Sequence, residues 1–207
     1  MEIVKMTSDV WSEIEFQINK SKKTYSSENS VVFNYAWEFQ KNNRNIIQSI
    51  DFEVPFFKDF SDGKFLDLLI SVKDSAQQIK IGFEFKFPQR KLNGSGQTQI
   101  RPKIINDIKR LSWLVEKNII DFGVFLCATN EKGYINKGNF RKYSEFETHH
   151  KKVYSAGEFF PFNSEYSEQV KIQKNIKFEW NNVLVNSNKI SIKDEKYSFL
   201  EPIIIFK

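Results

Sequence analysis

Two carboxylates and a lysine occupy neighbouring apolar segments in a pattern that can bind a cation. Asp67 lies in segment 64–73, and Glu84 and Lys86 lie in segment 78–88. A hairpin joining the segments pairs residues whose numbers sum to 151, so Asp67 faces Glu84 with Cβ atoms ~4.5–5.5 Å apart. Lys86, two residues beyond Glu84, projects from the same face. Facing carboxylates repel each other, and a divalent cation between them would reverse that sign because hard cations take oxygen ligands.

The opposite face of the same hairpin is apolar. In this register the pairs are Leu66 with Phe85, Leu68 with Phe83, Ile70 with Ile81 and Val72 with Ile79. A slip of one residue would move all of these side chains to the other face, so the hydrophobic pattern specifies the register. We therefore expect one face to pack in the core and the other to carry the charged residues.

The segments on either side of the hairpin predict the elements that position it. Helices are expected at 9–20, at 28–41 with Ser26 or Ser27 as the N-cap, and at 102–117, and strands at 46–56, 122–128, 176–185 and 199–206. The order of hairpin, helix and buried apolar strand indicates an α/β fold, with a mixed central sheet flanked by helices. We expect a single domain over residues 1–207, with a core at about 28–128 and a C-terminal elaboration at 130–207.

Positive charge is concentrated in the middle of the chain. The net charge is +5, and residues 86–117 carry 8 basic against 2 acidic side chains, or +6. Helix 102–117 buries its aliphatic positions and is expected to expose a basic side, which is typical of a surface that contacts phosphates. A solvated helix face explains the same pattern. The basic residues expected to contact nucleic acid are Arg90, Lys91, Arg101, Lys103 and Arg110.

Asp67, sixteen intervening residues and then Glu84-Phe85-Lys86 resemble the motif of the PD-(D/E)XK nuclease superfamily, which includes many restriction endonucleases. The order of elements over about 28–128 resembles the restriction-endonuclease-like core. Several stretches are also similar to small bacterial members of unassigned function. Leu66 stands where the motif's name has proline.

The resemblance implies roles for individual residues. Asp67, Glu84 and the backbone carbonyl of Phe85 would hold Mg²⁺, for which Mn²⁺ can substitute, and Lys86 would orient or help to deprotonate the attacking water. Glu38 would match a catalytic glutamate of the first helix, a role for which Glu53 competes. Gln97 or Gln99 would match a polar residue after the second hairpin strand, and Gln99 would join the nucleic-acid contacts.

Other chemistries have little support in the sequence. Cys127 is the only cysteine, which excludes an intramolecular disulfide framework, and its apolar segment predicts a small core residue. His149 and His150 are adjacent in a polar segment, where their side chains would point apart. There is no phosphate-binding glycine motif and no apolar run of membrane-spanning length. Without a secretory signal pattern at the N-terminus, we expect a cytoplasmic protein with no membrane partner.

Three functions remain open. The first is a metal-dependent nuclease that hydrolyses DNA phosphodiester bonds, an endonuclease in restriction, repair or defence, as a homodimer or a subunit of a larger complex. The second is a catalytically inactive DNA-binding or regulatory protein on the same fold. The third is an α/β interaction protein with no nucleic-acid role, against which the +6 central segment argues.

Overall fold

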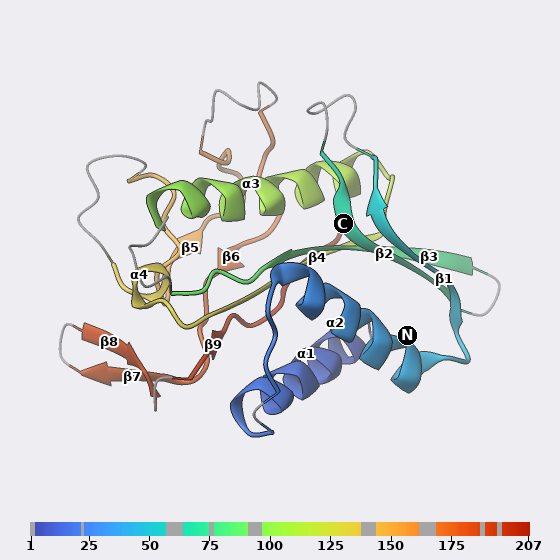
Figure 1. Ribbon diagram of the computed structural model, residues 1–207. Helices are drawn as coiled ribbons and strands as arrows, with labels where there is room; N and C mark the ends of the chain where they lie inside the picture. Colours follow the sequence, from blue (N-terminus) through green and yellow to red (C-terminus); the bar gives the residue numbers. More distant parts are fainter. Residues whose placement is uncertain are drawn as a thin grey trace.

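The computed structural model describes residues 3–21, 23–56, 64–74, 77–90, 97–137, 144–161, 169–186, 189–193 and 196–207. Helices cover both faces of a central sheet, α1 (Ile3–Asn19) and α2 (Glu28–Asn43) on one face and α3 (Gln97–Glu116) on the other (Figure 1). The expected α/β class, with a mixed sheet between helices, is confirmed. None of the helices in the described ranges is both long enough and apolar enough to cross a membrane.

The central sheet has the strand order β1-β2-β3-β4-β10, and β9 also pairs with β4. The strands are β1 (Ile47–Val54), β2 (Leu66–Asp74), β3 (Gln77–Lys86), β4 (Phe122–Thr129), β9 (Ser198–Phe199) and β10 (Ile203–Ile205). β1, β2 and β3 are antiparallel neighbours, whereas β3 and β4 are parallel and are connected through α3. This crossover places α3 directly over the strand that carries Glu84 and Lys86.

The predicted hairpin register is confirmed over most of its length. The ladder between β2 and β3 runs from Leu68 opposite Phe83 to Asp74 opposite Gln77. Leu66 departs from the prediction: it pairs with Val54 of β1 and joins the core on the α3 side, away from Phe85. β2 therefore leaves the ladder with β3 near Asp67, one of the residues expected to carry chemistry.

Two apolar cores stabilise the sheet from its two sides. Beneath α1 and α2, Trp11, Tyr35 and Phe39 pack against Phe83 and Phe85 of β3, with several of these aromatic pairs edge-to-face or tilted. The second core lies between the sheet, α3 and the chain after β4. Side chains of β3 alternate between these cores, so Phe83 and Phe85 face α2 while Glu84 faces α3.

The N-terminus of α2 forms where the sequence predicts it. Ser27 is the N-cap and its hydroxyl accepts from the amide of Ser30, while the Ser30 hydroxyl accepts from the amide of Ser27. This reciprocal cap satisfies two amides that a helix start leaves without partners. It also fixes Glu28 as the first helical residue, with consequences for the site described below.

α3 begins earlier and is more buried than the sequence predicts. It starts at Gln97, so Pro102 lies inside the helix. Of its side chains from residue 101 onward, only Lys103 and Glu116 are exposed. The prediction of an exposed basic side is wrong, because the C-terminal third covers the helix: Phe146, Tyr154 and Trp180 belong to the same core as Leu111 and Leu114.

The C-terminal third forms short elements and then returns to the sheet. It contains α4 (Lys132–Ile135), the pair β5 (Val153–Tyr154) with β6 (Ile176–Lys177), and the hairpin of β7 (Val183–Asn186) with β8 (Lys189–Ile192). β9 and β10 then pair antiparallel with β4. The strands expected at 176–185 and 199–206 are therefore present as shorter pieces.

Two paired glycines lie in the central strands, and one of them, Gly123, allows α3 to approach the sheet. Gly82 of β3 pairs with Gly123 of β4. A Cβ atom at Gly123 would lie 2.9 Å from Leu111 Cβ and 3.4 Å from the Leu111 carbonyl oxygen, whereas one at Gly82 would meet the ends of the Ile120 and Leu66 side chains. We expect Gly123→Ala to lower the free energy of unfolding by about 1–3 kcal/mol through overpacking, and Gly82→Ala to cost less.

Urea unfolding of the two variants measures the difference. Gly82→Ala is the matched control, because flexible side-chain ends can move aside and the helix backbone cannot. Equal losses in the two variants would contradict the claim that α3 is closest to the sheet at Gly123.

Candidate active site

Asp67 lies at the point where β2 leaves its ladder with β3. Beyond the pair of Leu68 and Phe83, the amide of Phe85 donates to the Asp67 carboxylate, with an N···Oδ2 distance of 2.7 Å. The carboxylate therefore supplies an acceptor to a main-chain amide beyond the end of the ladder. This bond holds Asp67 against the stretch of β3 that carries Glu84 and Lys86.

Glu84 is buried against α3. Its side chain is 1% exposed, and Oε1 accepts from Arg110 Nη2 at 2.9 Å. The same Nη2 atom lies 2.5 Å from Asp107 Oδ1, so one guanidinium nitrogen bridges two carboxylates. Asp107 and Arg110 are three residues apart on α3, which places both side chains on one helix face.

Lys86 is held by carboxylates from two helices. Its ammonium lies 2.9 Å from Asp107 Oδ2 and 3.2 Å from Glu28 Oε1, and it donates to the Phe85 carbonyl oxygen at 2.7 Å. Glu28 also accepts from the amide of Phe87 through Oε2 at 2.9 Å. The first residue of α2 and the middle of α3 thus fix the end of β3 from two sides.

Burial is the main cause of the shifted carboxyl pKa values in this network, and the neighbouring charges modify it. Burial raises the pKa of Asp67 to about 6, although Lys86 and the Phe85 amide oppose the rise. Burial also raises the pKa of Glu84 well above its ordinary value, and Asp107 adds to this, against the effect of Arg110. For Lys86 burial alone would lower the pKa, but Asp107, Glu28 and Asp67 raise it well above its ordinary value. The lysine therefore stays protonated beside carboxylates that lack enough positive charge.

Glu38 does not join this group, contrary to the role that the resemblance implies for it. It lies ten residues after Glu28, ~15 Å along α2, and its carboxylate accepts from Gln17 at 3.0 Å and from Lys41 at 3.1 Å. These bonds keep the Glu38 pKa below its ordinary value despite burial. Glu53, the alternative, is exposed on β1. Glu28 is the helix carboxylate at the site, and its sequence signal was its place directly after the N-cap serine.

The predicted nucleic-acid contacts divide into buried and exposed residues. Arg110 is buried in the ion-pair network, and Arg101 is buried with its guanidinium donating to the Gly133 carbonyl oxygen, so neither forms an exposed surface. Arg101 was expected just before helix 102–117 and Arg110 on its exposed side; instead Arg101 bonds to the main chain of α4 and Arg110 faces Glu84 of the sheet. Arg90 and Lys103 are exposed. Lys91 and the side chains of Gln97 and Gln99 lie outside the described residues.

A cleft of about 420 Å³ leads to the lysine of the network. Its walls include Glu28 at the start of α2, the chain from Lys86 to Arg90, and Lys103 of α3. The volume falls in the range of ordinary ligand clefts, ~300–1,000 Å³. Lys86, whose side chain is 15% exposed, faces this cleft, whereas Glu84 lies behind it in the interior.

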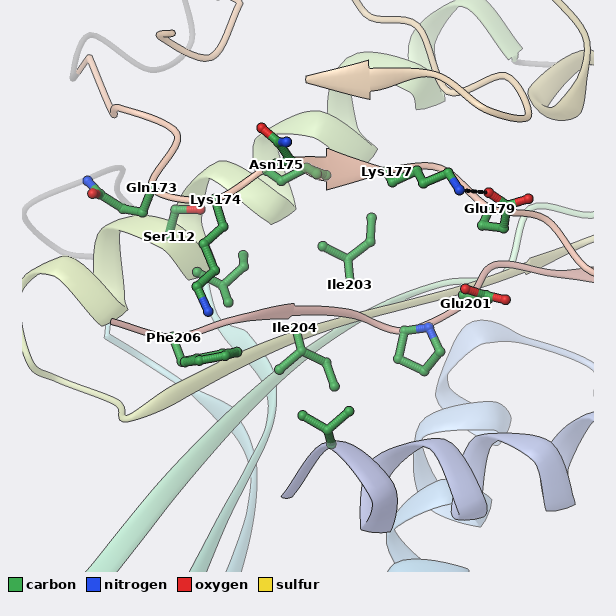
Figure 2. Close-up of a pocket in the computed structure, with 14 residues that line it drawn as sticks. Ser112, Gln173, Lys174, Asn175, Lys177, Glu179, Glu201, Ile203, Ile204 and Phe206 are labelled. Carbon is green, nitrogen blue, oxygen red and sulfur yellow. Dashed lines mark ion pairs between the residues drawn. The ribbon is translucent and has the colours of Figure 1, made fainter. Parts of the chain in front are cut away.

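A second hollow, of about 320 Å³, lies along β10, the edge strand of the sheet opposite β1. Figure 2 shows Lys174 and Phe206 close together there, with Lys177 paired to Glu179 at 2.6 Å. That pairing lowers the pKa of Glu179. The Glu179 carboxylate of this hollow is therefore neutralised by a lysine, whereas the carboxyl groups of Asp67 and Glu84 have raised pKa values.

The oxygen atoms at this site suit a hard cation that takes only a few ligands from the protein. Within the described ranges, no three His, Cys, Asp or Glu side chains are grouped to hold a metal ion. Asp67 and Glu84 provide two carboxylates, and Mg²⁺ commonly takes only one or two, completing its shell with waters and substrate phosphates. The Phe85 carbonyl accepts from Lys86 and has a second lone pair. Two carboxylates with raised pKa values fit such an ion in chemistry and in charge.

The remaining candidates have structural roles. Cys127 is buried in β4, and burial raises its thiol pKa well above the ordinary value, which suits a core residue. His150 Nδ1 accepts from the amide of Trp180, and Nε2 of the same ring lies 3.6 Å from Glu179.

Comparison with family models, curated proteins and solved structures finds no match to this chain.

The raised pKa of Asp67 predicts a pH-dependent stability in metal-free protein. Because its folded-state pKa of about 6 exceeds the ordinary 3.8, the folded state binds this proton more tightly. The free energy of unfolding should therefore fall as pH rises from about 4 to about 6, by up to ~3 kcal/mol from this group. Urea unfolding with EDTA should show this fall in the wild type and a smaller one in Asp67→Asn. Parallel pH profiles for the two proteins would contradict the assignment.

Proposed function

We propose that this chain is a metal-dependent nuclease that hydrolyses DNA phosphodiester bonds, on a restriction-endonuclease-like fold. The observation that carries the proposal is the meeting of Asp67, Glu84 and Lys86 at one end of β3, next to a cleft whose rim bears Arg90 and Lys103. The order α2, β1, β2, β3, α3, β4 is the order of elements that the resemblance implies, with the carboxylates on its second and third strands. Glu28 of α2 supports the proposal further, because its carboxylate contacts the ammonium of Lys86.

Each residue has a chemical role in this proposal. Asp67 and Glu84 would hold Mg²⁺ or Mn²⁺ with the Phe85 carbonyl. The ion when bound makes water a better nucleophile at neutral pH and offsets phosphate charge. Lys86, whose pKa is raised, acts as a hydrogen-bond donor and positive charge toward the phosphate, and is no general base. Glu28 and Asp107 orient its ammonium.

Substrate binding is assigned to the rim of the cleft. Arg90 and Lys103 are exposed there and can contact phosphates without reading bases. We further propose DNA as the polymer, with a homodimer or a larger complex supplying a second site where both strands are cut.

One observation favours a second candidate, a catalytically inactive DNA-binding or regulatory protein. Arg110 already neutralises part of the charge on Glu84, and Asp107 holds Lys86 on the side of α3. An ion-pair network of this kind can persist for structural reasons alone. The two candidates differ in whether a divalent ion changes what the site does to DNA.

A cleavage assay separates them. Wild-type protein should cut plasmid or single-stranded DNA with Mg²⁺ or Mn²⁺ and not with EDTA. Asp67→Asn and Glu84→Gln should abolish cutting, and Lys86→Met should slow it by about 10²–10³-fold, as expected for loss of a positive charge at the reacting phosphate. Glu38→Gln is the matched control and should cut normally, because Glu38 lies in a separate hydrogen-bond group. Metal-independent cutting, or loss of cutting in Glu38→Gln alone, would contradict the assignment.

The rim residues predict a salt effect that does not depend on catalysis. Neutralising both Arg90 and Lys103 to Gln should weaken DNA binding and reduce the slope of log affinity against log salt by roughly 2, one counterion for each lost contact. The control is Lys73→Gln with Lys80→Gln, two exposed lysines toward the far end of the hairpin. Fluorescence anisotropy in EDTA over a salt series gives both slopes. An equal change in both double variants would show that binding is not located at the cleft.

A further inference from the structure

Within the part of the chain that the structure describes, the charges that meet at the site do not balance. Six charged side chains contact or electrostatically influence one another there. They are the carboxylates Glu28, Asp67, Glu84 and Asp107 and the cations Lys86 and Arg110. With all six ionised, four negative and two positive charges leave −2. Desolvation makes such an imbalance costly inside a protein. One divalent ion would cancel it, whereas two would leave +2.

Arg110 occupies the position of a bridging cation. Its Nη2 atom lies 2.9 Å from Glu84 Oε1 and 2.5 Å from Asp107 Oδ1, so two carboxylates from different elements share one positively charged nitrogen. A metal ion between the same oxygens would face the same two ligands. The guanidinium is permanently charged, since arginine does not lose its proton in proteins.

The carboxylates of Asp67 and Glu84 each keep an oxygen for an exogenous ion. Asp67 Oδ2 accepts from the Phe85 amide and Glu84 Oε1 accepts from Arg110. Each carboxylate therefore retains a second oxygen outside these two bonds. One ion held by Asp67 and Glu84 uses these oxygens without displacing Arg110.

We propose that the site takes a single divalent cation, between Asp67 and Glu84, and that the Arg110 guanidinium is a built-in second cation between Glu84 and Asp107. This inference rests on the proposed function for the metal itself and adds the number of ions and the role of Arg110. Arg110 is here a positioning residue: it sets the charge and orientation of Glu84 and leaves room for one ion.

The experiment counts Mn²⁺ ions bound to the full-length chain, using electron paramagnetic resonance of free Mn²⁺ at equilibrium. Wild type should bind one ion, and Asp67→Asn should weaken its binding by at least about tenfold. Arg110→Met should bind two, because Glu84 and Asp107 then face each other without the guanidinium. Adding Asp107→Asn to Arg110→Met should restore one ion. Arg110→Lys, which keeps the charge, should bind one.

Each outcome decides the point. Two ions in wild type, none, or one in a folded Arg110→Met variant would overturn the inference, with folding checked by circular dichroism. If Arg110→Met does not fold, the single variant Asp107→Asn takes its place in the test. It should still bind one ion with near wild-type affinity, and loss of that ion would overturn the inference. One bound ion without DNA cleavage would refute the nuclease and leave the ion count standing.

Discussion

The structure depends on the burial of more negative than positive charge at the end of one strand. Among the described residues, four carboxylates meet two cations where β3 passes between α2 and α3, and burial raises the pKa values of Asp67 and Glu84 there. A fold that needed only stability could fill this space with apolar side chains at little or no cost. An excess of carboxylates over cations is expected in the interior if a bound divalent ion neutralises it, as in the proposed chemistry.

The rest of the fold holds those charges in place. The pairing of β2 with β3 brings Asp67 beside the main chain of Phe85, and the serine cap of α2 places Glu28 beside Lys86. Gly123 of β4 lets α3 come close to the sheet. The packing of α3 on the sheet turns Arg110 toward Glu84 of β3 and makes it an internal residue. Each contact is local, yet together they create a site that none of the elements could form alone.

The sequence predicted the part of the site that depends on strand periodicity. Alternation along a hairpin fixes which residues share a face, so Asp67, Glu84 and Lys86 could be grouped from their spacing. Leu66 departs from the pattern because β2 leaves its ladder with β3 before that residue while still paired with β1, which no alternation encodes. Glu28, Asp107 and Arg110 could not be found this way, because they reach β3 only through the packing of two helices. Glu38 was assigned by its match to a glutamate of the first helix, whereas in the structure its carboxylate accepts from Gln17 of α1.

The proposed metal site requires that a divalent ion relieve the negative charge shared by Asp67 and Glu84. Isothermal titration of the chain with Mn²⁺ at pH 6, in two buffers of different ionisation enthalpy, tests it directly, because the heat reports protons released on binding. With pKa values raised as they are, part of the carboxylate population is protonated at this pH, and binding should release protons to the buffer. Binding with no proton release would show that the carboxylates were already ionised, and no binding at all would remove the metal from the account.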